Sequence, residues 1–236
     1  VYYNENPLSG AYRNLVTHPR PSHADWVAMT KYKGFADYRG GGHFSGRLTL
    51  GLVTAGVVAK LILKKLYKNK IKFDTVLSEI GGCADPDRFP EIIEEALRTQ
   101  DSVGGIVECT ASGVPVGLGE PFFDSAESVM SHLLYSVPAV KAVEFGLGFG
   151  SAKLHGSENN DPIMSPDGAT ATNHSGGIVG GITNGNPVVV RVAVKPTSSI
   201  SSPQLTLNTE TGTPERLVIK GRHDACIAMR AVVGIE

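Results

Sequence analysis

Cysteine and aromatic residues are scarce in this chain of 236 residues, and neither sign of charge is in excess. The three cysteines are odd in number and lack CxxC spacing, which argues against a disulfide framework or a structural zinc site and favours a reducing compartment such as the cytoplasm. The 22 Lys and Arg residues balance 23 Asp and Glu residues. A general nucleic-acid binder that depends on phosphate attraction is therefore not expected.

Long uninterrupted apolar runs and targeting signals are also missing. The most apolar stretch, residues 51–66, contains Thr54, Lys60, Lys64 and Lys65, so it is not predicted to cross a membrane. No signal peptide is visible. The seven histidines form no HExxH or other strong metal-binding pattern, and no metal site is predicted.

Glycine, in contrast, is abundant: the chain has 28, about 12% against a usual ~7%. More than half of the glycines are clustered between apolar runs. Clusters of this kind allow sharp turns or a close approach of the backbone to a ligand. The pattern alone does not distinguish ordinary tight turns from ligand-binding loops. The clusters lie at 40–42, 81–82, 104–105, 146–150 and 176–185.

The length suits one large domain or two small ones, and we find no repeat and no linker. Apolar periodicity predicts a single α/β domain with mixed strands. Asp124 is a candidate N-cap for the third helix. Residues 150–175 form a long polar loop, and no closing helix is expected after residue 224. The predicted helices are 45–68, 86–99 and 124–137, and the predicted strands are 71–80, 102–110, 140–145, 186–194 and 216–219.

Two short clusters each combine arginine, histidine and aspartate. One is Arg20-Pro-Ser-His23-Ala-Asp25 and the other is Arg222-His223-Asp224. Arginine binds phosphate or carboxylate through a rigid fork, and histidine exchanges a proton near neutral pH. The clusters are either surface salt bridges or parts of an anion-handling active site. Lys195, with the three hydroxyls of residues 197–199, is a plausible phosphate cradle.

Taken together, these segments resemble chorismate synthases, and they follow the family's order over nearly the whole chain. Ordered agreement at many places is more specific than any single motif. The matching segments are Arg20-Pro-Ser-His-Ala-Asp25, Lys31-Tyr32, Asp37-Tyr-Arg-Gly-Gly-Gly42, Ser45-Gly-Arg47, Asp101-Ser-Val-Gly-Gly105, Gly117-Leu-Gly-Glu-Pro121, Ala139-Val-Lys141, Gly148-Phe-Gly-Ser-Ala-Lys153, Gly156-Ser-Glu-Asn-Asn-Asp-Pro162, 176–185, Lys195-Pro-Thr-Ser-Ser199 and Gly221-Arg-His-Asp224.

The resemblance implies a β-α-β sandwich, with helices packed between two antiparallel-rich sheets, assembled as a homotetramer. It implies a cytoplasmic lyase that eliminates phosphate from 5-enolpyruvylshikimate 3-phosphate in an anti-1,4 sense to give chorismate. The reaction requires reduced FMN, with NADPH as a possible reductant, and involves no nucleic acid or membrane.

The resemblance also assigns roles to residues. His23 and Asp224 are implied to be catalytic, His23 in flavin protonation and Asp224 as a base. Substrate binding is implied for Arg20, Arg47 and Arg222. Flavin binding is implied for His43, Phe44, Ser45, Pro138, Ala139, Gly180, Lys195, Pro196, Thr197, Ser198, Ser199 and again Arg222.

The sequence departs from the family pattern at three places, and these departures support an alternative to catalysis. His43-Phe44 replaces an Arg-Ser pair, Pro138 replaces Asn, and Ala225 replaces Pro. The family's N-terminal Gly-Glu-Ser-His-Gly motif and its C-terminal helix are expected to be missing from this single domain of residues 1–236. The alternative is therefore a non-catalytic relative that binds a phosphorylated ligand or only assembles.

Overall fold

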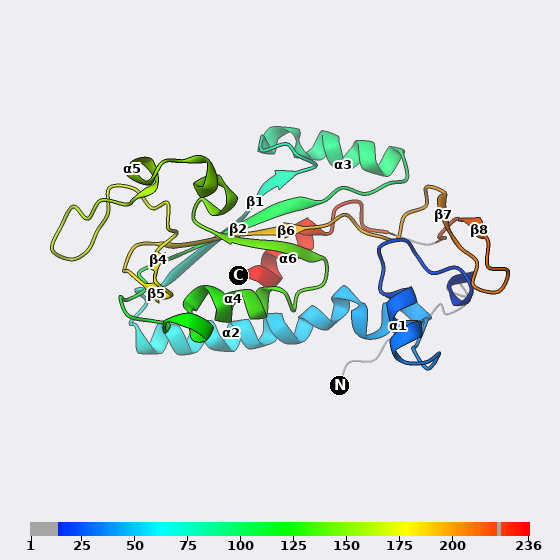
Figure 1. Ribbon diagram of the computed structural model, residues 1–236, viewed down its shortest axis with the longest axis horizontal. Coiled ribbons are helices and arrows are strands. Elements are labelled where there is room, and N and C mark those ends of the chain that lie inside the picture. The colour runs from blue at the N-terminus through cyan, green and yellow to red at the C-terminus, as the bar shows by residue number, and fades with distance from the viewer. Residues whose placement is uncertain (1–13, 221–222) are drawn as a thin grey trace.

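A four-stranded antiparallel sheet forms the centre of the computed structural model, which describes residues 14–220 and 223–236 (Figure 1). Its strand order is β1-β2-β6-β3. A register shift interrupts the β1–β2 pairing between Leu77 and Glu79. The strands are β1 (Lys72–Ile80), β2 (Gly105–Ser112), β3 (Val140–Phe145) and β6 (Val188–Val194).

The valine run of β6 places this strand in the middle of the sheet. Val188, Val190, Val192 and Val194 are buried, and the residues between them are only partly covered. This alternation is the period of a strand that buries one face. The buried side chains pack with those of β2 and with Ala228 and Ala231 of the C-terminal helix, so the core lies between the sheet and the helices.

Three helices contribute to the layer beside this core: α2 (Thr49–Leu66), α4 (Ala126–Leu134) and α6 (Ala228–Ile235). Helix α6 contacts β1, β2 and α2, while α4 contacts β3. Helix α3 (Phe89–Arg98) lies on the other side of the sheet from α2 in Figure 1. The helices and antiparallel strands together confirm the predicted α/β fold class.

Helix α2 has an exposed apolar surface that includes Leu61, Ile62 and Leu66. By length and composition alone, residues 46–66 could cross a membrane, with a mean hydropathy of 1.6. This differs from the prediction, because the lysines gather near the end of the helix and leave the preceding apolar stretch unbroken. A core helix of a soluble protein passes the same test, so α2 assigns no membrane location.

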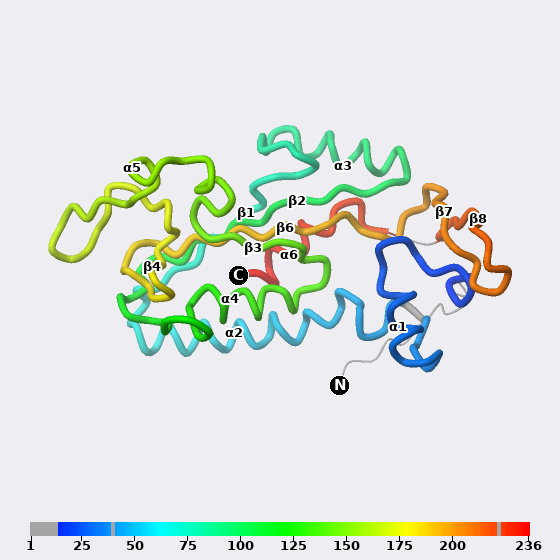
Figure 2. The backbone as a smooth tube through the Cα atoms, viewed as in Figure 1, coloured from blue at the N-terminus to red at the C-terminus, as the bar shows by residue number. Residues whose placement is uncertain are grey.

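The smaller elements gather at the two ends of the molecule (Figures 1 and 2). At one end lie α1 (Asp25–Lys31) and the ribbon of β7 (Gln204–Leu207) and β8 (Pro214–Leu217). At the other end lie α5 (Gly156–Asn159) and the ribbon of β4 (Ile178–Val179) and β5 (Ile182–Thr183). The short 3-10 helices are Arg39–Phe44, Gly46–Leu48, Pro86–Arg88, Phe122–Asp124 and Gly148–Lys153.

Two sequence predictions about helix ends need correction. The N-cap of α4 is Ser125, whose side chain accepts a hydrogen bond from the Ser128 N–H, whereas Asp124 closes the preceding 3-10 turn. A hydroxyl in this position satisfies one of the free N–H groups of the first turn. A helix does follow Asp224: α6 buries Ala228, Ala231 and Ile235 against the sheet.

The long segment 150–175 is ordered around the carboxylate of Asp161. Asp161 accepts hydrogen bonds from Thr172 Oγ1 (2.7 Å), His174 N (2.7 Å) and Ser175 N (2.9 Å). Burial alone would raise the pKa of Asp161, but these hydrogen bonds lower it to about 2. The polar loop therefore has its own anchor, which the sequence pattern did not indicate.

We expect Asp161→Ala to destabilise the protein by about 2–3 kcal/mol, because it leaves several donors without their charged acceptor. The matching fall in Tm is about 5–10 °C. Since the pKa of Asp161 is lowered in the folded state, its contribution is present above about pH 4 and is lost as the pH falls towards 2. Thermal unfolding between pH 2 and 7 measures both effects.

Asp167→Ala is the matched control for this substitution. Asp167 lies in the same segment and its carboxylate accepts a hydrogen bond from the Ser165 side chain, but it is exposed. It should change the free energy of unfolding by no more than about 0.5 kcal/mol. Equal losses for the two variants would show that Asp161 is not the anchor.

Candidate active site

The β7–β8 ribbon holds the chain segment that leads into the Arg20 cluster. Leu15 is buried against Leu217 and Ile219 in a small apolar cluster. Thr206 Oγ1 donates a hydrogen bond to the carbonyl oxygen of Pro19 (2.6 Å), next to Arg20. Residues distant in sequence thereby fix the position of a short, proline-rich segment that has little regular structure of its own.

Arg20, His23 and Asp25 form one hydrogen-bonded network. The guanidinium of Arg20 donates to Asp25 Oδ2 from Nε (2.7 Å) and to Asp25 Oδ1 from Nη2 (2.7 Å). The ring atom Nδ1 of His23 lies 2.6 Å from Asp25 Oδ1. The Arg20 side chain is only 5% exposed, and that of Asp25 is 11% exposed. This is a largely desolvated ion pair, unlike the exposed pairs on the helices.

The geometry gives Arg20 a structural role that the sequence analysis did not assign, and its implied role in substrate binding stays a prediction. Its guanidinium donates to Asp25 and also to Ser199 Oγ (2.8 Å). Through these hydrogen bonds the buried side chain of Arg20 holds two segments of the site together.

The segment that follows β6, residues 195–199, lies against the network of Arg20, His23 and Asp25; it is called the lysine segment below. Lys195 Nζ donates to the carbonyl oxygen of Ser22 and to Ser198 Oγ (2.7 Å), and Ser198 Oγ also donates to Ser22 O (3.0 Å). Ser199 accepts from Arg20. The structure therefore brings Arg20 and His23 together with Lys195, Ser198 and Ser199, although more than 170 residues separate the two groups.

Two lysines give this region a positive character. Burial, and then the charge of Lys141, lower the pKa of Lys195. Neither lysine forms an ion pair with a carboxylate in the described part of the chain. The buried hydroxyl of Thr197 has no hydrogen-bond partner there. Two cations without an anion, beside a free hydroxyl, are suited to hold a phosphate group.

The loop before α2 approaches His23 from another side. Gly41 has a φ of +84°, and a Cβ added to it would lie 3.6 Å from His23 Nε2. Farther along this loop, Ser45 caps the Gly46–Leu48 turn by accepting from Arg47 N (3.3 Å). His43, Phe44 and Arg47 are exposed. The predicted flavin-binding residues 43–45 thus follow Gly41, which lies beside His23. Of these residues, His43 and Phe44 are open to solvent and Ser45 is partly covered.

The remaining predicted flavin-binding residues do not all lie near His23. Ala139 has a φ of +75°, and its carbonyl oxygen accepts from Lys195 N (2.9 Å), so Ala139 and its neighbour Pro138 adjoin the lysine segment. Gly180 lies in the β4–β5 turn at the opposite end of the molecule. Arg222 lies outside the described residues. Pro196 lies in the lysine segment and is exposed.

Asp224 lies in the segment that precedes α6. Its carboxylate accepts from Arg230 Nη2 (2.8 Å) and Nε (3.0 Å), and its side chain is 42% exposed. The backbone of its neighbour Ala225 accepts from Val103 N (2.8 Å), and Ser102 Oγ donates to Thr197 O (2.8 Å). The segment of Asp224 and the lysine segment thus both dock onto residues 102–103.

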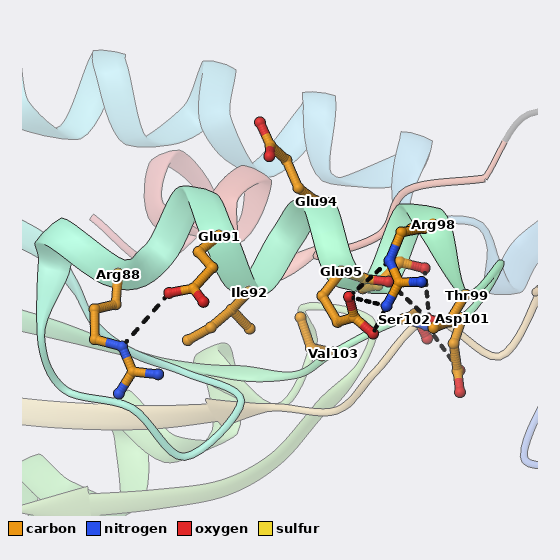
Figure 3. A pocket seen from close by; sticks show the side chains of 11 residues that line it. Arg88, Glu91, Ile92, Glu94, Glu95, Arg98, Thr99, Asp101, Ser102 and Val103 are labelled. Atoms are coloured by element: carbon orange, nitrogen blue, oxygen red, sulfur yellow. Dashed lines mark hydrogen bonds and ion pairs between the residues drawn. The ribbon is translucent and has the colours of Figure 1, made fainter.

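An open groove of about 580 Å³ runs beside α3, and Ser102 and Val103 form part of its lining (Figure 3). Its charged side chains mostly pair with one another: Arg98 Nη2 lies 2.6 Å from Glu95 Oε2, and Arg88 Nε lies 3.7 Å from Glu91 Oε2. These are exposed ion pairs on one helix, which contribute little stability and leave little charge for a ligand. The hydrogen-bonded network around His23 is therefore the stronger candidate.

Sequence reasoning placed Asp25 in a motif, where an aspartate can act as a base or orient a neighbouring group, but did not name it as a site residue, and it named no role for Lys141. The signal for Asp25 was available, because an acid two residues after a histidine at the start of a helix can turn back to the imidazole. The position of Lys141 near Lys195 depends on the pairing of β3 with β6, which no local pattern reveals.

Comparison with known proteins gives a consistent result over the whole length. The family model described as "Chorismate synthase" matches residues 1–236. The chain belongs to the chorismate synthase family. It is 55% identical over 236 residues to the chorismate synthase of Chitinophaga pinensis and 45% identical over 262 residues to that of Korarchaeum cryptofilum. The alignments cover 100% of this chain and 69% and 72% of those relatives.

A solved structure agrees with this assignment. The crystal structure of a chorismate synthase matches with a TM-score of 0.63 and 29% identity, over 72% of this chain and 62% of the solved chain. The chain therefore spans about three-fifths of the solved chorismate synthase. Chorismate synthases are lyases of the shikimate pathway, and the family reaction converts 5-enolpyruvylshikimate 3-phosphate to chorismate with loss of phosphate.

Proposed function

We propose that the region around His23 is part of a chorismate synthase active site that acts on 5-enolpyruvylshikimate 3-phosphate with reduced FMN. The observation that carries this proposal is the hydrogen-bonded His23–Asp25–Arg20 network beside Lys195. It combines a proton-exchanging imidazole with a cationic phosphate site. An elimination that releases phosphate and a ring proton needs both.

The residues of the chain have separate tasks in this proposal. Lys195 and Lys141 bind and orient a phosphate group, and their charge stabilises an anion without rearrangement of the site. The imidazole of His23 holds or moves a proton at Nε2, which lies beside Gly41. Asp224 is proposed as a second proton-handling group, and Arg47 as a cation in the open loop for the substrate.

The flavin supplies, when bound, the electron density that a ring carbon requires as its phosphate group departs. The residues present fit such a group. Thr197 has a buried hydroxyl without a partner, and Lys195 has no carboxylate partner among the described residues. The hydroxyls of Ser198 and Ser199 are already hydrogen-bonded to Lys195 and Arg20. The phosphate of FMN is therefore proposed to be held by Lys195, Lys141 and Thr197.

Assembly, reductant and location are part of the same proposal. We infer a homotetramer, because the resemblance implies one and exposed apolar side chains of α2 remain uncovered in one chain. The free cysteines suit a cytoplasmic enzyme. NADPH is the proposed source of electrons where the flavin is reduced by the protein itself.

Anaerobic assay of the full-length protein tests the proposed function directly. With reduced FMN and 5-enolpyruvylshikimate 3-phosphate, we expect equal amounts of chorismate and phosphate. Oxidised FMN without a reductant should give neither product. A full-length protein that binds the substrate and FMN but forms no chorismate would instead support the non-catalytic alternative.

We expect Lys195→Ala to weaken FMN binding about 10- to 100-fold, because one charge-assisted hydrogen bond to the phosphate contributes about 1.5–3 kcal/mol. Riboflavin has the same ring but no phosphate, so its affinity should change by less than about 3-fold. Flavin fluorescence titration measures both affinities. Lys72→Ala, at the far end of β1, is the control. Equal weakening of the two flavins would contradict the assignment.

A further inference from the structure

The carboxylate of Asp25 is surrounded by donors from the same short segment. Oδ2 accepts from the backbone N of Arg20 (3.0 Å) and from its Nε (2.7 Å). Oδ1 lies 2.7 Å from Arg20 Nη2 and 2.6 Å from His23 Nδ1. Burial alone would raise the pKa of Asp25, but the hydrogen bonds and charges of Arg20 and His23 hold it well below its usual range. Asp25 is therefore ionised and can only accept.

An acceptor in this position decides which ring nitrogen of His23 carries the hydrogen. A contact of 2.6 Å between Asp25 Oδ1 and His23 Nδ1 requires a hydrogen on Nδ1. Arg20 Nη2 lies 3.0 Å from the same Nδ1, but a guanidinium has no lone pair to offer it. The Nη2 hydrogen points instead to Oδ1 at 2.7 Å. The neutral ring is therefore the Nδ1–H tautomer.

The other ring nitrogen is left as the reactive atom. Within the described part of the chain, no group is hydrogen-bonded to Nε2, which lies beside the backbone of Gly41. Glycine at this position keeps the space next to Nε2 open, because a side chain would begin 3.6 Å from it. The Nδ1–H tautomer makes Nε2 the lone-pair nitrogen that takes up a proton.

We propose that Asp25 is a positioning residue that holds His23 in the Nδ1–H tautomer and presents Nε2 to the reacting molecule. This role rests on the proposed function of His23. Arg20 connects this pair to the lysine segment. It donates hydrogen bonds to both carboxylate oxygens of Asp25 and to Ser199 Oγ (2.8 Å). The orientation of the imidazole is thereby linked to the segment proposed to hold phosphate.

Asp25→Asn removes the charge at nearly constant shape. Arg20 can still donate to the amide oxygen, and the amide N–H group then turns towards His23 Nδ1. His23 Nδ1 must then accept a hydrogen bond through its lone pair. The ring hydrogen therefore moves to Nε2, and Nε2 can no longer take up a proton. We expect kcat to fall at least about 100-fold, with KM changed less than about 3-fold.

Nitrogen-15 NMR of histidine-labelled full-length protein measures the tautomer directly. Spectra are recorded at alkaline pH, where imidazole is neutral, and the His23 signals are assigned by their loss in His23→Gln. We expect Nδ1–H in the native protein and Nε2–H in Asp25→Asn. Asp25→Glu retains a carboxylate and should keep the Nδ1–H form and recover part of kcat. A purely structural role for Asp25 would leave the tautomer unchanged.

Each outcome has a defined meaning. Native protein in the Nε2–H form, or Asp25→Asn with native kcat, overturns the proposal. If Asp25→Asn does not fold, the native tautomer and the Asp25→Glu variant still decide it. Native protein that shows Nδ1–H but forms no chorismate would overturn the proposed function and leave the pairing of Asp25 with His23 in place.

Discussion

Replacing His23 with glutamine is expected to lower the rate of chorismate formation by about 100- to 10,000-fold, the usual contribution of a positioned acid–base group. Glutamine keeps a polar side chain near Asp25 and Arg20, so the buried ion pair between them survives. Only the group that exchanges a proton is removed. The loss should therefore appear in kcat, while KM and the affinity for FMN stay within about 3-fold of native values.

A matched control separates this effect from the loss of any histidine. His132 lies exposed on α4, and no hydrogen bond to its side chain is present among the described residues. His132→Gln should retain native activity. The two variants are compared under anaerobic conditions with reduced FMN, together with their thermal unfolding curves. Native turnover by a folded His23→Gln protein would remove His23 from the proposed mechanism.

Local sequence pattern predicted most of the central elements. The alternating valines of β6 and the apolar spacing of α2 and α3 each produce the expected element within a few residues. Helix α6 was missed even though Ala228, Ala231 and Ile235 share one helical face. The two-stranded ribbons were harder, because strands of two to four residues are too short to show a clear alternation. Of these strands only β8 was anticipated, by the predicted strand at 216–219.

In the candidate site, too, the sequence identified the individual motifs, but the contacts between motifs depend on the fold. Arg20 and Ser199 are 179 residues apart, and only the fold brings them within 2.8 Å. The resemblance assigned a binding role to each of them, but it could not show that Arg20 donates to Asp25 and to Ser199. Side-chain direction follows from the packing of all surrounding segments. For the same reason, no pattern could show that the β4–β5 turn, with Gly180, lies at the end of the molecule opposite α1.

Asp224→Asn is expected to reduce turnover to about 1% of the native rate or below, while the protein remains folded and binds FMN. Asp224 is half exposed, and its partner Arg230 is more exposed still. An ion pair of this kind contributes only about 0–1 kcal/mol to stability. A large loss of activity would therefore come from chemistry rather than from unfolding.

Two further variants separate the chemistry from the ion pair. Arg230→Gln breaks the same pair but leaves the Asp224 carboxylate in place, so it should retain most of the activity. Glu95→Gln removes a carboxylate from a similar exposed pair with Arg98 on α3, for which no role in the reaction is proposed, and should retain native activity. If Asp224 is a proton-handling group, only Asp224→Asn loses turnover. Equal losses in Asp224→Asn and Arg230→Gln would assign the pair a structural role at the start of α6, because the carboxylate would then matter only through its partner.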